Sequence, residues 1–402
     1  MKYLLSCTLS FFLLTTLFSQ NPEQIRFYKE GTLDSRFVTD TIPIEIWNDL
    51  VLIKAKVNNI EGTFIWDNGF SITALDSVFL SKNKIVLDEN LSTISGTDGN
   101  NQQVNFYPLL IDEINIGKAI VKTTYVTQIN VNSISHSNRK IDGILGGSII
   151  NKLNWSFNFD ENYVVVSKYP FIKEGKKLNI ELTDWNTHLI KCTLNGYDVG
   201  LALIDFGDNG DNFTITIDAS SLFPQSKAIE KRGLSAMSVG GRGTIDTSYI
   251  ITGGYTYSLS GEIFDFTPKI EFTNKDDAMT IGNRFFRRYN VIINPQQGNY
   301  ILTKRETKLE EFPKKSYGLM LAKINNEIIV AYTISNPNLT NKSINPLDKV
   351  IKVDDKEVTF FEDFVALKKY QQDALKKGKK LKITFFNGTE YEFKPMMNIE
   401  KF

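Results

Sequence analysis

Two short stretches decide how this sequence folds: Phe64-Ile65-Trp66-Asp67-Asn68-Gly69 and Ala202-Leu203-Ile204-Asp205-Phe206-Gly207. Each is an apolar run, typical of a buried strand, that ends in a single Asp followed by a Gly-containing turn. An Asp-x-Gly turn after a strand is common when it occurs alone. Its recurrence in the same form further along the chain indicates an internal repeat.

The sequence around the two stretches repeats in the same order. Tyr163 corresponds to Tyr300, and Leu145-Gly146 corresponds to Ile281-Gly282. The spacing between the members of each pair is nearly the same as that between Asp67 and Asp205. Because this offset is kept with single-residue gaps, we interpret the chain as a duplicated lobe.

The two lobes, at residues 20–170 and 171–306, are predicted to consist mainly of strands. Short apolar or alternating runs are separated by turn residues. The predicted strands are 50–57, 63–66, 121–126, 163–167, 201–204, 213–217, 291–293 and 300–303. Short helices are predicted at 76–82, 147–152 and 284–288. This pattern indicates a mainly β protein with two barrel-like lobes and a cleft between them.

The composition restricts the chemistry that the protein can carry out. The 402 residues include 46 Lys and Arg and 46 Asp and Glu, so the formal net charge is zero. A nucleic-acid partner is therefore not expected, since such binding needs an excess of basic residues. The two His residues, His136 and His188, make a multi-His metal site nearly impossible. We expect no metal and no cofactor, and a chemistry that uses carboxylates.

The N-terminus indicates export. Lys2 precedes an apolar run at residues 4–18, which predicts a signal peptide at residues 1–19. Its removal leaves Cys192 as the single cysteine, which the surrounding strand pattern places in the core. We expect an exported bacterial protein, periplasmic or secreted, with no membrane span in the mature chain.

The paired stretches resemble those of the pepsin-like and retropepsin-like aspartic proteases. That family uses an apolar-apolar-Asp-Thr/Ser-Gly pattern in each lobe, and a later apolar-Gly segment beneath which the Asp loop passes. Here the later segments are Ile144-Leu145-Gly146 and Thr280-Ile281-Gly282, and the resemblance covers residues 40–306. It implies two duplicated β-barrel lobes in which Asp67 and Asp205 face each other and share a proton.

The chemistry of such a pair follows from electrostatics. Two carboxylates about 3 Å apart cannot both ionise, so one keeps a proton while the other acts as a base. The base activates a water that attacks a peptide carbonyl, and the acid polarises that carbonyl. The sequence therefore predicts an endopeptidase with Asp67 and Asp205 as catalytic residues and a polypeptide substrate. The resemblance makes Asn68, Gly69, Phe206 and Gly207 the residues that support the two catalytic loops.

Flaps over the cleft are expected at two Gly-rich hairpin tips. The first contains Gly96, Asp98 and Gly99, and the second contains Gly240 and Gly241.

Three residues depart from the family pattern and leave a second function open. The family has Thr or Ser after each catalytic Asp, where this chain has Asn68 and Phe206. Asn68 can still donate a hydrogen bond, whereas the Phe206 side chain cannot. Asp208 adds a third carboxylate nearby. The alternative is therefore a catalytically degenerate protein that binds peptides or acts as a scaffold. His136 is expected in a solvated loop, and His188 at the rim of a strand.

The remainder of the chain predicts a third unit at residues 316–396, after a charged linker at residues 307–315. It reads as two strands, a polar stretch, a helix at 360–375 and a hairpin around Asn387-Gly388. This order resembles a bacterial PDZ domain, although Leu347 stands where that family has Gly. The resemblance implies that Tyr317, Gly318 and Leu319 form a loop that binds the carboxylate of a peptide ligand.

Overall fold

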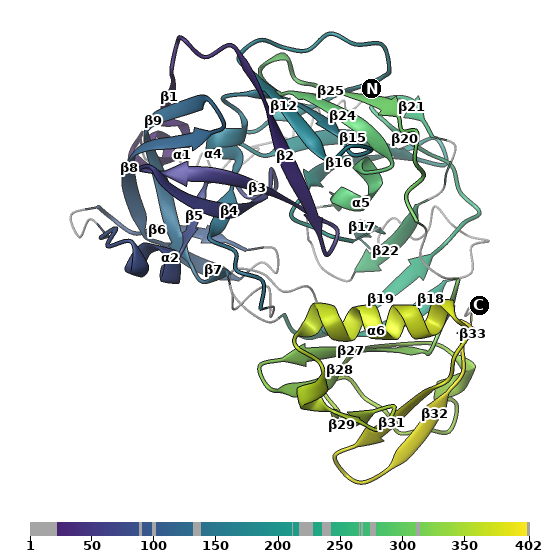
Figure 1. The fold of residues 1–402 in the computed structure, drawn as a ribbon. Helices are drawn as coiled ribbons and strands as arrows, with labels where there is room; N and C mark the ends of the chain where they lie inside the picture. Colours follow the sequence, from purple (N-terminus) through teal and green to yellow (C-terminus); the bar gives the residue numbers. More distant parts are fainter. Residues whose placement is uncertain are drawn as a thin grey trace, which may run out of the picture.

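The computed structural model describes residues 22–87, 91–98, 102–131, 138–210, 212–216, 228–234, 243–264, 266, 268–273, 279–310 and 314–399. The expected signal peptide, His136, Gly99, Gly240 and Gly241 lie outside these residues. The described chain is mainly β, as predicted, and most of its strands belong to two large sheets (Figure 1). Within these ranges no helix is long and apolar enough to cross a membrane.

The first unit contains a closed barrel of six strands. Each strand pairs with the next in the order β3, β4, β10, β5, β9 and β8, and β8 pairs back with β3. The strands are β3 (Leu50–Val57), β4 (Ile60–Trp66), β10 (Gly143–Leu145), β5 (Ala74–Asp76), β9 (Ala119–Ile129) and β8 (Pro108–Ile116). Around the barrel lie α1 (Pro22–Lys29), β1 (Thr32–Leu33), α2 (Ser77–Lys82), the hairpin of β6 (Ile94–Thr97) and β7 (Gln103–Phe106), and α4 (Gly147–Ile150). Inward-facing apolar side chains of these strands fill the barrel.

The second unit repeats the central pairings of the first. β16 pairs in parallel with β23, β23 antiparallel with β17, and β17 in parallel with β22, as β4, β10, β5 and β9 do in the barrel. The strands are β14 (Glu181–Leu182), β15 (His188–Leu194), β16 (Tyr197–Asp205), β17 (Asn212–Thr216), β18 (Ile229–Leu234), β19 (Ile245–Ile251), β20 (Tyr257–Leu259), β21 (Glu262–Ile263), β22 (Lys269–Thr273) and β23 (Met279–Gly282). Helix α5 (Asn283–Phe286) follows β23, as α4 follows β10.

A sheet of six strands joins the two units. Its order is β2 (Thr39–Trp47), β12 (Tyr163–Ser167), β11 (Asn154–Asn158), β24 (Tyr289–Asn294), β25 (Asn299–Lys304) and β13 (Lys176–Asn179). At its centre β11 and β24 are antiparallel, with Trp155 opposite Ile293 and Phe157 opposite Val291. The short 3₁₀ helix Pro295–Gln297 connects β24 to β25.

The third unit has its own apolar core. It comprises β26 (Lys315–Ser316), β27 (Leu319–Ile324), β28 (Glu327–Ile334), β29 (Lys349–Val353), β30 (Lys356–Glu357), α6 (Phe364–Lys376), β31 (Leu381–Phe385), β32 (Glu390–Phe393) and β33 (Met396–Met397), with 3₁₀ turns at Pro337–Leu339 and Val358–Phe360. Helix α6 begins later than predicted because the carboxylate of Asp363 caps it, accepting a hydrogen bond from Ala366 N at 2.8 Å. The predicted turn at Asn387-Gly388 lies between β31 and β32, with Gly388 at φ +83°.

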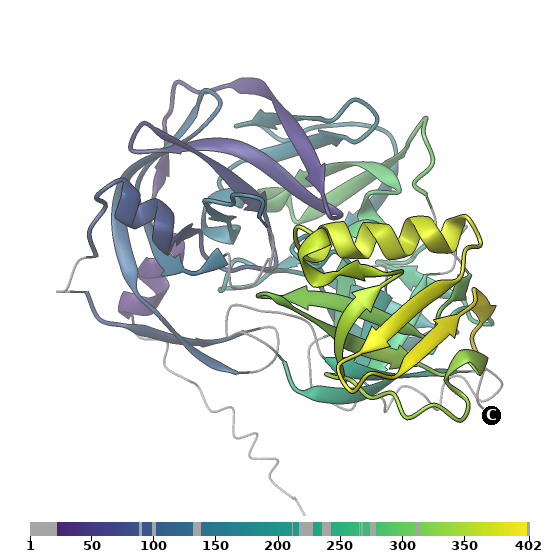
Figure 2. The ribbon, with the colours of Figure 1, turned by 60° about the horizontal axis from the view of Figure 1, so that its bottom comes forward.

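The third unit is attached to the rest of the protein through strand pairing as well as through its linker. β28 pairs with β18, so one sheet runs from the second unit into the third. Helix α6 lies on the side of the third unit that faces the other two (Figures 1 and 2). Lys368 on this helix donates to Asn48 of the β2–β3 turn at 2.8 Å, and Asn138 N donates to Asp363 at 3.1 Å.

Candidate active site

Asp67 and Asp205 occupy equivalent places at the ends of two strands. Asp67 follows β4, and its N–H donates to the carbonyl of Leu145 on β10 at 3.0 Å. Asp205 is the last residue of β16 and lies opposite Gly282 on β23. In both units the strand that carries the Asp therefore runs parallel to the predicted apolar-Gly segment.

The two Asp carboxyl groups face each other, and each lies against the glycine of the other loop. A Cβ atom on Gly69 would collide with the Asp205 carboxyl, and one on Gly207 would collide with the Asp67 carboxyl. The two carboxyl groups are therefore close enough for each to change the pKa of the other. Gly is therefore required at both positions, because any side chain would separate the acids.

Each carboxyl group is held by the backbone of its own loop. Asp67 Oδ1 accepts from the N–H groups of Gly69 at 2.9 Å and Phe70 at 3.1 Å. Asp205 Oδ1 accepts from Gly207 at 2.7 Å and Asp208 at 3.1 Å. Both acids are therefore fixed in the same way, with one oxygen on the backbone and the carboxyl groups turned toward each other.

The surroundings raise the pKa of this pair, so that it stays protonated at a pH where an exposed Asp would be ionised. Burial raises the pKa of Asp67, which is 9% exposed, and the backbone hydrogen bonds only partly oppose this. Burial and the adjacent negative charge of Asp67 raise the pKa of Asp205 well above its usual value. Because the groups share a proton, they titrate as one unit.

A third carboxyl group, that of Asp208, lies next to the pair. Its Oδ1 accepts from Gly210 N at 2.7 Å. Burial, and then the charge of Asp205, raise the pKa of Asp208 to about 7. The nearest ion pair is that of Lys231 and Glu271, whose Nζ and Oε1 atoms are 2.7 Å apart.

Asn68 connects the loop of Asp67 to the loop of Asp205. Its Nδ2 donates to the carbonyl of Ile204 at 2.9 Å, and its Oδ1 accepts from Phe206 N at 3.0 Å. The side chain is fully buried. Asn68 therefore joins the two units by hydrogen bonds, including the donated bond expected from the sequence.

Phe206 contributes to the site through packing. Its side chain is fully buried and contacts the ring of Trp66, which precedes Asp67, with ring centroids 5.0 Å apart. It also stacks on Phe157 and Phe286. The ring lies beneath the loops, away from the space between the two carboxyl groups, and so does not separate them.

The prediction that His188 lies at a rim is wrong: its side chain is fully buried. His188 begins β15, and the inward-facing residues of that strand alternate from it, through Ile190, to Cys192. Its Nδ1 lies 2.6 Å from the hydroxyl of Tyr300, which in turn accepts from Asn68 Nδ2 at 3.0 Å. Neither His188 nor Tyr300 was connected to the site from the sequence, although the strand alternation from His188 to Cys192 was an available signal.

One of the two predicted flaps lies partly in the described residues, which include Gly96 and Asp98 but not Gly99. Gly96 belongs to β6 of the β6–β7 hairpin and Asp98 follows it, with Gln102 N donating to Asp98 Oδ1 at 2.8 Å. Phe106 at its base contacts Phe70, two residues after Asn68, with ring centroids 6.1 Å apart. This hairpin is therefore attached directly to the loop of Asp67.

In the third unit, backbone groups at and near the expected peptide-binding loop are bonded to side chains of the same unit. Gly318 has φ +85°, and its N–H donates to Ser316 Oγ at 3.1 Å, while Tyr317 is buried. Beyond Leu319, both backbone groups of Leu321 bond to the side chain of Gln371 on α6, at 3.0 and 3.2 Å. The free edge of β27 is therefore occupied by this amide.

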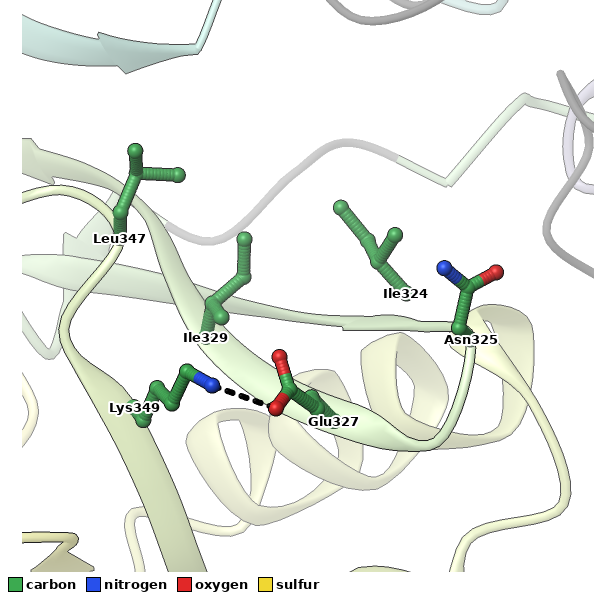
Figure 3. A pocket seen from close by; sticks show the side chains of 6 residues that line it. All are labelled: Ile324, Asn325, Glu327, Ile329, Leu347 and Lys349. Atoms are coloured by element: carbon green, nitrogen blue, oxygen red, sulfur yellow. Dashed lines mark hydrogen bonds and ion pairs between the residues drawn. The ribbon is translucent and has the colours of Figure 1, made fainter.

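A cavity lies on the third unit, away from the Asp pair. It has a volume of about 310 Å³ and is lined by Ile324, Asn325, Glu327, Ile329, Leu347 and Lys349 (Figure 3). Its lining combines three apolar side chains with the Glu327–Lys349 ion pair, whose Oε1 and Nζ atoms are 2.5 Å apart. In the ranges that the structure describes, no group of three or more His, Cys, Asp or Glu residues could hold a metal ion.

Comparison with known proteins gives no match: no protein-family model and no curated protein matches this chain. A function for this protein therefore has to be inferred from the geometry of the site.

Proposed function

We propose that this protein is an aspartic-type endopeptidase in which Asp67 and Asp205 form the catalytic pair. The observation that carries the proposal is the reciprocal placement of the two acids, each packed on the glycine of the other loop. Two acids held this way share one proton near neutral pH, which is the state that general acid–base hydrolysis needs.

The reaction follows from the shared proton. The ionised carboxyl group takes a proton from water, and the water oxygen attacks the carbonyl carbon of a peptide bond. The protonated carboxyl group donates to the carbonyl oxygen. Collapse of the tetrahedral intermediate breaks the C–N bond, the leaving nitrogen takes a proton from one Asp, and the diol oxygen returns one to the other.

The register between the units supports the proposal that they are duplicated lobes of this protease class. The offset that relates Leu145 to Ile281 also relates Trp155 to Val291 and Phe157 to Ile293. Trp155 lies opposite Ile293, and Phe157 opposite Val291. The pairing therefore maps onto itself when the two lobes are exchanged, as a two-fold relation between duplicated lobes requires.

We further propose that residues 316–396 form a PDZ domain that binds polypeptide, and that the protein acts in the periplasm or outside the cell. Leu347 has φ +75°, a backbone conformation that favours Gly, which the family has at this position. Helix α6 and strand β27 are adjacent, as in a peptide-binding groove, and a bound peptide strand would replace the Gln371 amide at Leu321.

Incubation of mature protein with casein and with a mixed peptide library, from about pH 3 to about pH 8, tests the proposal. Peptide bonds should be cleaved, and Asp67→Asn and Asp205→Asn should each abolish cleavage. Asp198→Asn changes an exposed carboxylate on the same strand as Asp205 and should leave the rate unchanged. Cleavage that persists in both active-site variants would exclude the mechanism.

A peptide-binding protein without catalysis is the second candidate. Asp208 favours it. A third carboxyl group beside Asp205 makes it harder to keep one acid of the pair ionised while the other is protonated. This candidate predicts that peptides bind with no turnover at any pH.

A further inference from the structure

A directed chain of hydrogen bonds leads from Asn68 into the protein interior. Asn68 Nδ2 donates to the hydroxyl of Tyr300 at 3.0 Å, and that hydroxyl lies 2.6 Å from His188 Nδ1. His188 Nε2 lies 2.6 Å from Asn151 Oδ1. Asn68, Tyr300 and His188 are each fully buried, and Asn151 is 5% exposed. The chain crosses between the units, because Asn68 and Asn151 belong to the first, His188 to the second and Tyr300 to the joining sheet.

Backbone groups fix the direction of this chain at both ends. Asn151 Nδ2 donates to the carbonyl of Asn186 at 2.8 Å, so Asn151 Oδ1 must face His188 and accept from it. At the other end Phe206 N donates to Asn68 Oδ1, so Asn68 Nδ2 must face Tyr300. Turning either amide over would place an oxygen against a carbonyl oxygen.

The orientations of the Asn151 and Asn68 amides determine where His188 and Tyr300 carry their protons. His188 carries its proton on Nε2, and its Nδ1 accepts the hydroxyl proton of Tyr300. Burial lowers the pKa of His188 to about 3, which agrees with a neutral ring. If the ring were cationic, Nδ1 would carry a proton, and the hydroxyl proton of Tyr300 would lose its acceptor.

We infer that Tyr300 and His188 are positioning residues for the catalytic pair and act through Asn68. The hydroxyl of Tyr300 occupies one proton of the Asn68 amide and holds the amide plane. The other proton and the amide oxygen then bond to the peptide groups on either side of Asp205. This inference rests on the proposed protease function for its consequence, whereas the hydrogen-bond chain itself is testable without activity.

Tyr300→Phe removes the central hydroxyl and little else. Tyr163→Phe is the control, since Tyr163 lies on β12 of the same joining sheet and its hydroxyl accepts from Asn158 on an outer hairpin, at 3.1 Å. In Tyr300→Phe we expect kcat to fall about tenfold or more with KM within about twofold, and the pH limits of kcat to move. Tyr163→Phe should keep the wild-type kcat and pH profile. Equal kcat values in the two variants, or a loss confined to thermal stability, would overturn the inference.

Nitrogen NMR of ¹⁵N-histidine-labelled protein gives the readout that does not need activity. The chain contains only two His residues, so His188 can be assigned by comparison with a His136→Gln variant. We expect the neutral Nε2–H form in wild type and in Tyr163→Phe, and a shifted Nδ1 signal in Tyr300→Phe. An Nδ1–H form in wild type would contradict the chain.

The two readouts separate the two claims. Wild-type protein that cleaves nothing, with the expected His188 spectrum, would remove the protease proposal and the catalytic consequence but keep the hydrogen-bond chain. Should Tyr300→Phe fail to fold, His188→Gln interrupts the same chain with another buried amide. It should give the same loss of kcat, and unchanged kcat in that variant would overturn the inference.

Discussion

The side chain of Asn68 bonds to the peptide groups on both sides of Asp205, accepting from Phe206 N at 3.0 Å and donating to Ile204 O at 2.9 Å. One unit thereby fixes the Asp205 loop of the other. The single amide of Asn68 makes both bonds from one side.

Asn68→Val should abolish activity and lower the free energy of unfolding by about 3 kcal/mol, because Phe206 N and the Tyr300 hydroxyl lose a buried partner. Asn68→Thr has almost the same shape as Val and retains a hydroxyl, so it should keep measurable activity. Urea unfolding and peptide cleavage of the two variants provide the comparison. Identical behaviour of Val and Thr would show that the polar bonds are unimportant.

Phe206→Ala should lower the free energy of unfolding by about 4 kcal/mol, since it empties space beneath both catalytic loops. Phe206→Leu refills most of that space and should cost less than about 2 kcal/mol. Activity should follow stability in this series, because the ring supports the loops and does not touch the reacting groups. Guanidinium unfolding measured alongside cleavage tests this; a fully stable Phe206→Ala protein would contradict the packing role.

Asp208→Asn should shift the alkaline limit of kcat/KM to lower pH, because removing a negative charge near Asp205 lets the pair lose its proton more easily. The same change should alter the pH dependence of stability. With a pKa of about 7 in the folded protein against an ordinary 3.8, Asp208 binds more protons when folded, so its contribution to stability falls between about pH 4 and about pH 7. Thermal melts of Asp208→Asn should fall less steeply over that window, and an unchanged slope would refute the assignment.

Asp49→Asn should lower the free energy of unfolding by about 3 kcal/mol. Asp49 Oδ1 accepts from Arg284 at 3.0 Å and Arg287 at 2.6 Å, and both arginines are almost fully buried. Loss of the carboxylate removes a negative charge that two buried cations share. Denaturant unfolding should show this loss. Asp198→Asn, which breaks an exposed pair with Lys191, should show no measurable change.

Gln371→Ala should speed hydrogen exchange at the amide of Leu321 by about tenfold or more, because the side chain of Gln371 is the partner of that N–H. Exchange measured by NMR or mass spectrometry reports this without a ligand. The amide of Lys382, which bonds to Asp354 at 2.7 Å on the other side of the unit, should exchange at its wild-type rate. Unchanged exchange at Leu321 would mean that the edge of β27 is protected by something else.

The sequence predicted the elements that carry the Asp pair, because strand periodicity and an ordered repeat are local signals. The predicted strands at 50–57 and 163–167 have the bounds of β3 and β12, and the helices after both apolar-Gly segments are present. The repeat also placed Asp67 and Asp205 in equivalent positions, which the structure brings together.

What the sequence did not reveal depends on contacts between distant segments. His188 was expected at a rim because it begins a strand close to Trp185; the structure buries it against Tyr300, far along the chain. Likewise the pairing of β18 with β28 joins segments that share no sequence pattern. Edge strands pair according to where the units lie, which neither hydrophobic periodicity nor turn residues specify.

Because β18 and β28 pair in one continuous sheet, the third unit is rigidly attached to the second. Gly233 lies against the backbone of Tyr332 with no room for a side chain, and Ser335 N donates to Glu230 O at 2.8 Å beyond the ladder. A protease nick in the linker would thus leave the fragments associated until the sheet itself is denatured. A polypeptide bound to the third unit would therefore approach the Asp pair from a fixed direction.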